Sequence, residues 1–63
     1  MADRHPLTIE QLGQILDDLA ASIESARQTA ATVSAAYGNN DARTIRAQEV
    51  HAALLRFEAA LKS

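Results

Sequence analysis

An apolar or small residue recurs at alternating steps of three and four positions through the first half of this chain. The repeat runs from Ile9 to Tyr37 without a slip. Its nine members are Ile9, Leu12, Leu16, Leu19, Ile23, Ala26, Ala30, Val33 and Tyr37. On an α-helix this spacing aligns all of them along one seam, which is typical of a helix that packs lengthwise on another helix. The repeat therefore predicts a long helix over about residues 9–37.

The start of this helix has its own signal. Thr8 is followed three residues later by Gln11, which is the spacing of a capping box, and Leu7 and Leu12 occupy the two positions of a hydrophobic staple. Glu10 places a negative charge at the positive end of the helix dipole. Together these residues predict that the helix begins directly after Thr8.

The sequence GNND follows Tyr37 and separates this helix from a second seam. Gly38 suits the left-handed position that commonly ends a helix, and either Asn40 or Asp41 can cap the next one. The second seam again has steps of three and four: Ala47, Val50, Leu54, Phe57 and Leu61. We therefore expect a short helix over about residues 42–62, joined to the first by a turn at residues 38–41.

These elements predict an all-α fold, an antiparallel hairpin of two helices. The hairpin forms a single domain over residues 1–63, with residues 1–7 as an N-terminal tail. Folding the chain about the turn places Leu61 opposite Leu19 and Phe57 opposite Ile23. The expected hairpin core is therefore Ile23, Ala26, Ala30, Val33, Val50, Leu54, Phe57 and Leu61.

The two helices differ in length. At about 1.5 Å per residue the first extends for about 44 Å and the second for about 32 Å, so the start of the first helix has no counterpart. A chain of 63 residues has a thin core, and with no cysteine and two histidines it has neither disulfides nor the usual ligands of structural zinc. We therefore expect a homodimer in which two hairpins form a four-helix bundle.

The uncovered start of the first helix is the expected partner or dimer interface. Its apolar residues recur with the spacing of an amphipathic helix that binds in a groove. They are Ile9, Leu12, Ile15, Leu16 and Leu19. Two alternatives stay open, namely that these residues form the core of the homodimer or that they bind another protein.

No motif in the chain indicates catalysis, a metal site or a cofactor site. His51 is expected on a solvated face, and His5 lies in the tail. Asp17 and Asp18 are adjacent, so they point about 100° apart on a helix, and we expect them to pair with Lys62 across the hairpin. The sequence therefore favours a protein that is not an enzyme.

Acidic residues outnumber basic ones by 8 to 6, which argues against broad electrostatic attraction to nucleic acid. The only candidate nucleic-acid contacts, and weak ones, are Arg27, Arg43 and Arg46. In size and topology the hairpin resembles the small plasmid regulators of the Rop type, which pair into four-helix bundles and bind paired RNA loops. The resemblance is architectural, with no shared motif, and we assign no family from it.

The function we expect is that of a small interaction protein, a dimeric helical hairpin that inhibits or tethers a protein partner. The alternatives are a Rop-like nucleic-acid-binding regulator and an accessory subunit of a larger complex. No apolar run approaches the length of about 18 residues that a membrane span needs, and the start of the chain lacks the apolar core of a signal peptide. We therefore expect no membrane partner, and we expect the protein in the cytoplasm.

Overall fold

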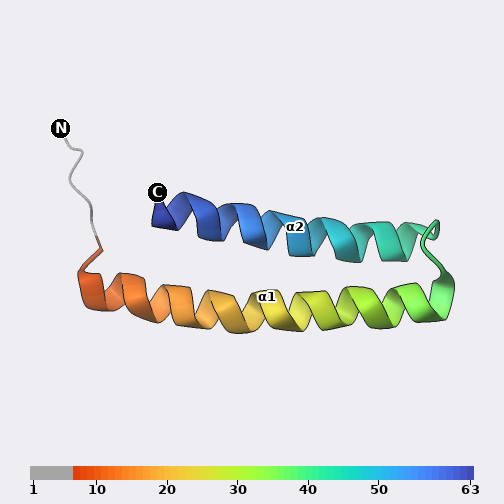
Figure 1. The fold of residues 1–63 in the computed structure, drawn as a ribbon, viewed down its shortest axis with the longest axis horizontal. Coiled ribbons are helices and arrows are strands. Elements are labelled where there is room, and N and C mark those ends of the chain that lie inside the picture. The colour runs from red at the N-terminus through yellow and green to blue at the C-terminus, as the bar shows by residue number, and fades with distance from the viewer. Residues whose placement is uncertain (1–6) are drawn as a thin grey trace.

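The computed structural model describes residues 7–63, which form two helices folded against each other along their length (Figure 1). Helix α1 spans Ile9–Tyr37 and α2 spans Ala42–Lys62. The body is elongated, with extents of 47 × 21 × 13 Å. The predicted all-α hairpin is confirmed, and both helices have the predicted bounds. Of the predicted tail, only Leu7 falls within the described residues, and His5 lies outside them.

The predicted capping box starts α1. Thr8 has an extended backbone, its Oγ1 accepts the N–H of Gln11 at 3.0 Å, and Oε1 of Gln11 accepts the N–H of Thr8 at 3.0 Å. At α2 the structure selects Asp41 as the cap, since its Oδ1 accepts the N–H of Arg43 at 2.8 Å. Each cap satisfies backbone donors that have no partner within the helix itself.

Gly38 ends α1 with a positive φ of 88°, as predicted. Its ψ of 162° is extended, however, so the predicted left-handed helical conformation is wrong. Its N–H still donates to the carbonyl of Ser34 at 2.8 Å, as in a continuing helix. The extended ψ gives the Gly38 carbonyl a partner in α2, the hydroxyl of Thr44, at 2.6 Å. This combination of angles is essentially open to glycine alone.

The core of the hairpin is thin. Among residues 7–63, Leu19 at 7% exposure and Thr44 at 0% are the only side chains that the fold buries fully. The α1 seam from Leu12 to Val33 is otherwise half-buried, while its two ends, Ile9 and Tyr37, are exposed. A single copy of the hairpin therefore removes little apolar surface from water.

Candidate protein-interaction site

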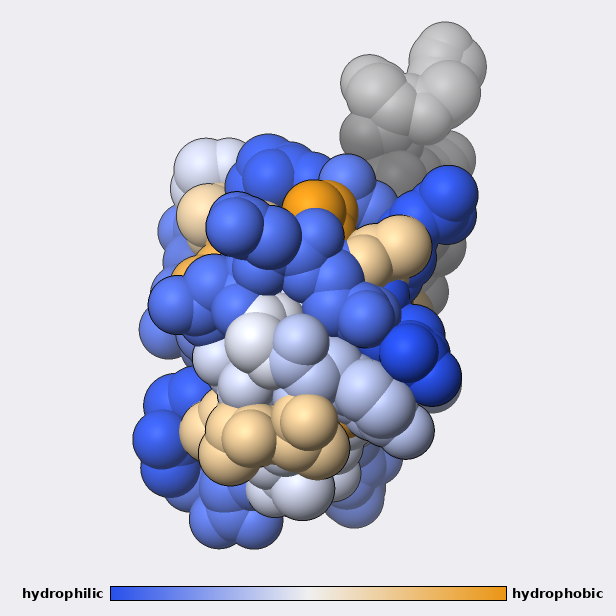
Figure 2. All heavy atoms as spheres, turned by 90° about the vertical axis from the view of Figure 1, so that its right-hand side faces the viewer, coloured by the Kyte–Doolittle hydropathy of each residue, from blue (hydrophilic) through white to orange (hydrophobic). Residues whose placement is uncertain are grey.

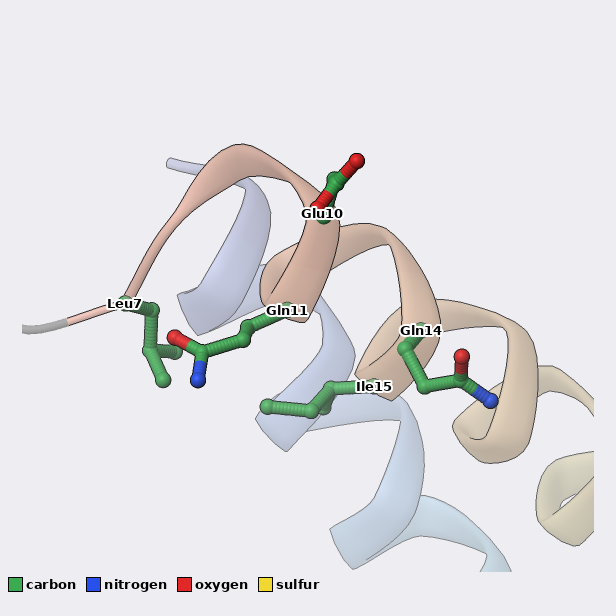
Figure 3. Close-up of a pocket in the computed structure, with 5 residues that line it drawn as sticks. All are labelled: Leu7, Glu10, Gln11, Gln14 and Ile15. Carbon is green, nitrogen blue, oxygen red and sulfur yellow. The ribbon is translucent and has the colours of Figure 1, made fainter.

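An open depression of about 390 Å³ lies at the start of α1. It is lined by Leu7, Glu10, Gln11, Gln14 and Ile15, and we call these five residues the N-terminal groove. Figure 3 shows Leu7, Gln11 and Ile15 extending to the same side, while Glu10 points away from them. Leu7 and Ile15 are half-buried, and the three polar residues are exposed. The groove thus has an apolar floor and a polar rim, which is the composition of small protein-binding sites.

Two features of the sequence produce this groove. The capping box holds Gln11 against Thr8, which fixes where the chain enters the helix and where Leu7 lies. The second feature is the length of α1. Its first turns extend past the C-terminal end of α2, so α2 does not cover them (Figure 1). Sequence reasoning found the overhang and the staple leucine, but it missed Glu10, Gln11 and Gln14 as lining residues because apolar periodicity does not report polar ones.

The five predicted interface residues do not form one surface. Ile9 is 89% exposed, Leu12, Ile15 and Leu16 are half-buried, and Leu19 is buried at 7%. Leu19 is therefore part of the hairpin's own core, and its prediction as an interface residue requires correction. Ile9 does not line the N-terminal groove, because it projects from the opposite side of the helix to Gln11, two positions along.

The predicted core residues of α1, together with Leu54 and Leu61 of α2, are half-buried. Val50 and Phe57 were expected in this core, and the structure places them outside it, with exposed fractions of 55% and 52%. The reason is a rotation of α2 about its axis. The residues that it turns inward instead again recur in steps of three and four: Thr44, Ala47, His51, Leu54, Glu58 and Leu61.

This inward row of α2 corrects two further expectations. His51 is half-buried in the row, although a solvated face was expected. The ammonium of Lys62 lies 3.6 Å from Oε2 of Glu58, one turn back on the same helix, and so it is not paired with Asp17 or Asp18 as predicted. The periodicity of apolar residues did not predict this row, because half of its positions are polar.

Each of the three candidate nucleic-acid contacts lies beside a carboxylate in the structure. The pairs are Arg27 Nε with Glu24 Oε1 at 3.1 Å, Arg43 Nε with Asp41 Oδ1 at 3.0 Å, and Arg46 Nε with Glu49 Oε1 at 3.9 Å. The guanidinium of Arg43 also lies 3.6 Å from the ring centre of Tyr37. A phosphate would have to compete with these partners, so the arginines do not form a free basic patch.

The first two of these pairs also shift the pKa values of their members. Hydrogen bonds from the side chain of Arg27 and then from Gln28 lower the pKa of Glu24 below its ordinary value. Hydrogen bonds from the side chain of Arg43 and then from its backbone N–H lower the pKa of Asp41 in the same way. Both carboxylates therefore favour their charged forms in the folded chain.

Within residues 7–63 no three or more histidine and acidic side chains gather closely enough to hold a metal ion. In the same part of the chain, neither helix combines the length and the apolar character needed to cross a membrane. Comparison with known protein families, curated proteins and solved structures finds no match for this chain. The geometry of the chain itself is therefore the basis for a functional assignment.

Proposed function

We propose that this chain is a small non-enzymatic interaction protein of the cytoplasm, a dimeric helical hairpin that inhibits or tethers a protein partner. One observation carries the proposal, namely the amount of large apolar surface that a single hairpin leaves in water. Ile9, Ile45, Val50, Leu55 and Phe57 are all exposed, whereas Leu19 is the one apolar side chain of residues 7–63 that is buried. Such an imbalance marks interaction surfaces in small soluble proteins.

The N-terminal groove is the part of the surface that we assign to the foreign partner. Leu7 and Ile15 offer a shallow apolar floor, and the amides of Gln11 and Gln14 supply hydrogen-bonding groups at its rim. An apolar anchor of the partner would fill the floor, and polar groups beside it would meet the rim. Whether the partner is inhibited, tethered or completed as a larger complex depends on its own identity.

Affinity capture from the native host tests this proposal when matched variants are used. The full chain carries a tag, and captured proteins are identified by mass spectrometry for the wild type, for Ile15→Glu in the groove, and for Ser25→Glu. Ser25 lines a different, more polar depression of α1 and serves as the control. We expect a protein that the wild type and Ser25→Glu retain and Ile15→Glu loses. Equal capture by all three forms would contradict the assignment of the groove.

The nucleic-acid alternative has a separate test. A gel-shift assay at low salt compares the wild type with the Arg43→Ala and Arg46→Ala double variant. We expect no shifted species in either case, since Arg43 is held by Asp41 and Tyr37 and Arg46 lies near Glu49. Binding that the double variant loses would instead support the nucleic-acid-binding regulator.

A further inference from the structure

Helix α2 presents an apolar face to solvent that the hairpin does not use. Val50, Ala53, Phe57 and Ala60 are all exposed and follow one another in steps of three, four and three, and we call them the α2 stripe. Meanwhile the inward row of the same helix contains His51 and Glu58. A helix with only one packing partner would bury Phe57 and expose Glu58. The arrangement is that of a helix with a second packing partner along the stripe.

Figure 2 shows the molecule from the turn end, where hydrophobic and hydrophilic residues are intermixed over both helices. Along α2, the exposed apolar residues of the α2 stripe form a narrow strip one residue wide at each step. A narrow strip with steps of three and four has the form of a coiled-coil seam, which accepts another helix. The stripe therefore fits a helical partner.

We propose that this partner is α2 of a second copy of the chain, packed antiparallel along the stripe. The proposal rests on the dimer of the proposed function and specifies which surface forms it. In the antiparallel register centred between Val50 and Ala53, each Val50 faces Ala53 of the second copy. Phe57 then faces Arg46 of the second copy, which would lie over the ring in a cation–π contact. Twofold symmetry makes each of these contacts twice.

Charge along the edge of the stripe favours this pairing. Glu49 and Arg56 lie on the same edge, one position before Val50 and Phe57, and both are exposed. In the antiparallel register Glu49 comes opposite Arg56 of the second copy, and Arg56 comes opposite Glu49. A parallel pairing would place the Glu49 edges of the two helices on opposite sides of the seam, where these charges do not meet. The α2 stripe and its charged edge are thus complementary to the same surface of a second copy when the two helices run antiparallel.

This dimer leaves the N-terminal groove open, because the groove lies on α1 and the stripe on α2. The homodimer and the foreign partner then use different surfaces. Under this proposal the exposed start of α1 is assigned to the foreign partner and not to the core of the homodimer.

Sedimentation equilibrium of the full chain tests the stripe. We expect the wild type at twice the chain mass of 6.8 kDa at micromolar concentration, and Phe57→Glu at the single mass. Leu55→Glu is the matched control and should stay dimeric, since Leu55 is an exposed leucine turned by about 200° from Phe57 on the same helix. The opposite result, with Leu55→Glu monomeric and Phe57→Glu dimeric, would overturn the assignment.

Charge reversal tests the pairing without altering the apolar contacts. Glu49→Arg and Arg56→Glu should each weaken the dimer by about tenfold, because each reversal replaces two attractive pairs by two repulsive ones. The double variant restores both attractions, so its dissociation constant should return to within about threefold of the wild type. Single variants that bind as tightly as the wild type, or a double variant without recovery, would contradict the antiparallel register.

Cysteine substitution reports the direction of the helices even if another variant unfolds, because the natural chain contains no cysteine. In a mixture of Val50→Cys and Ala53→Cys chains, we expect the mixed disulfide to form faster than either symmetric one. A predominant Val50→Cys symmetric disulfide would show a parallel dimer and overturn the inference.

A wild type at the single chain mass would remove the dimer altogether and assign the stripe to a foreign partner. A dimer unaffected by Phe57→Glu and by both reversals would overturn the inference alone and leave the proposed function standing.

Discussion

The hydroxyl of Thr44 donates a hydrogen bond to the carbonyl oxygen of Gly38 at 2.6 Å, and it thereby joins the first turn of α2 to the end of α1. Thr44 is fully buried, whereas the turn residues around it are exposed or half-buried. Gly38 can offer its carbonyl in this direction because its φ of 88° and ψ of 162° are open to glycine. The direction in which the chain reverses thus depends on both residues together.

Replacement of Thr44 by valine should lower the free energy of unfolding by about 1–2 kcal/mol. Valine keeps the shape of the side chain but removes the hydroxyl, so the Gly38 carbonyl keeps only the longer contact from the N–H of Asp41, at 3.4 Å. Urea unfolding followed by circular dichroism measures the change at fixed protein concentration. Thr32→Val, at an exposed position of α1, is the control and should stay within about 0.5 kcal/mol of the wild type. Equal losses in the two variants would refute a specific role for the Thr44 hydroxyl.

The two glycines of the chain should respond to alanine in opposite directions. Neither position has a heavy atom within 4 Å of the added Cβ, so crowding contributes to neither result. Gly38→Ala should cost about 1–3 kcal/mol, because alanine is strained at this positive φ. Gly13→Ala should add about 0.5–1 kcal/mol, because Gly13 lies inside α1, where alanine is the better helix former. Urea unfolding of both variants gives the comparison, and a neutral Gly38→Ala would mean that the turn relaxes without strain.

The apolar period, the caps and the turn residues predicted both helices to their ends, because these signals are local to the sequence. The rotation of α2 was beyond such reasoning. The row that contains Val50 and Phe57 and the row that contains His51 and Glu58 have the same spacing, and apolar character alone favoured the first. The structure turns the second row inward, so the deciding contacts are those between helices and not those within α2.

The candidate site was predictable only in part for a similar reason. The difference in helix length located it at the start of α1, and Ile15 was among the predicted residues. Leu19 was assigned to the same surface because it continues the seam. The position of the C-terminal end of α2 decides where the seam becomes covered, and Leu19 lies in the covered part. The polar rim of the groove depends on the directions of the side chains near the capping box. The periodicity of apolar residues in the sequence does not predict these directions.

Leu19 and Ile9 belong to one seam, and the structure predicts very different costs for truncating them. Leu19→Ala should destabilise the hairpin by about 2–3 kcal/mol, since the side chain is 7% exposed and its removal leaves a cavity in a thin core. Ile9→Ala should stay within about 0.5 kcal/mol, because this side chain is 89% exposed. Urea unfolding of the two variants at equal concentration checks the difference. Similar costs would indicate that the seam is covered uniformly, as in a bundle that encloses the start of α1.

Acid should weaken the hairpin partly through Asp41. Its pKa in the folded chain lies below its ordinary value of 3.8, through hydrogen bonds from the side chain and then the backbone of Arg43. The unfolded chain therefore binds this proton at a higher pH than the folded chain does. The stability that results is fully present above about pH 4 and is lost as the pH falls through the lower, folded pKa.

Asp41→Asn should keep the cap, because the asparagine side chain also accepts the N–H of Arg43, and it should remove this contribution to the pH dependence. Urea midpoints between pH 2 and 6 should therefore fall less steeply with acid for Asp41→Asn than for the wild type. Glu24→Gln should act in the same direction, since its pKa is lowered by Arg27 and then by Gln28. Asp17→Asn removes one exposed carboxylate of equal charge and controls for the change in net charge. If Asp17→Asn flattened the profile as much as Asp41→Asn, the acid response would come from overall charge and not from the cap.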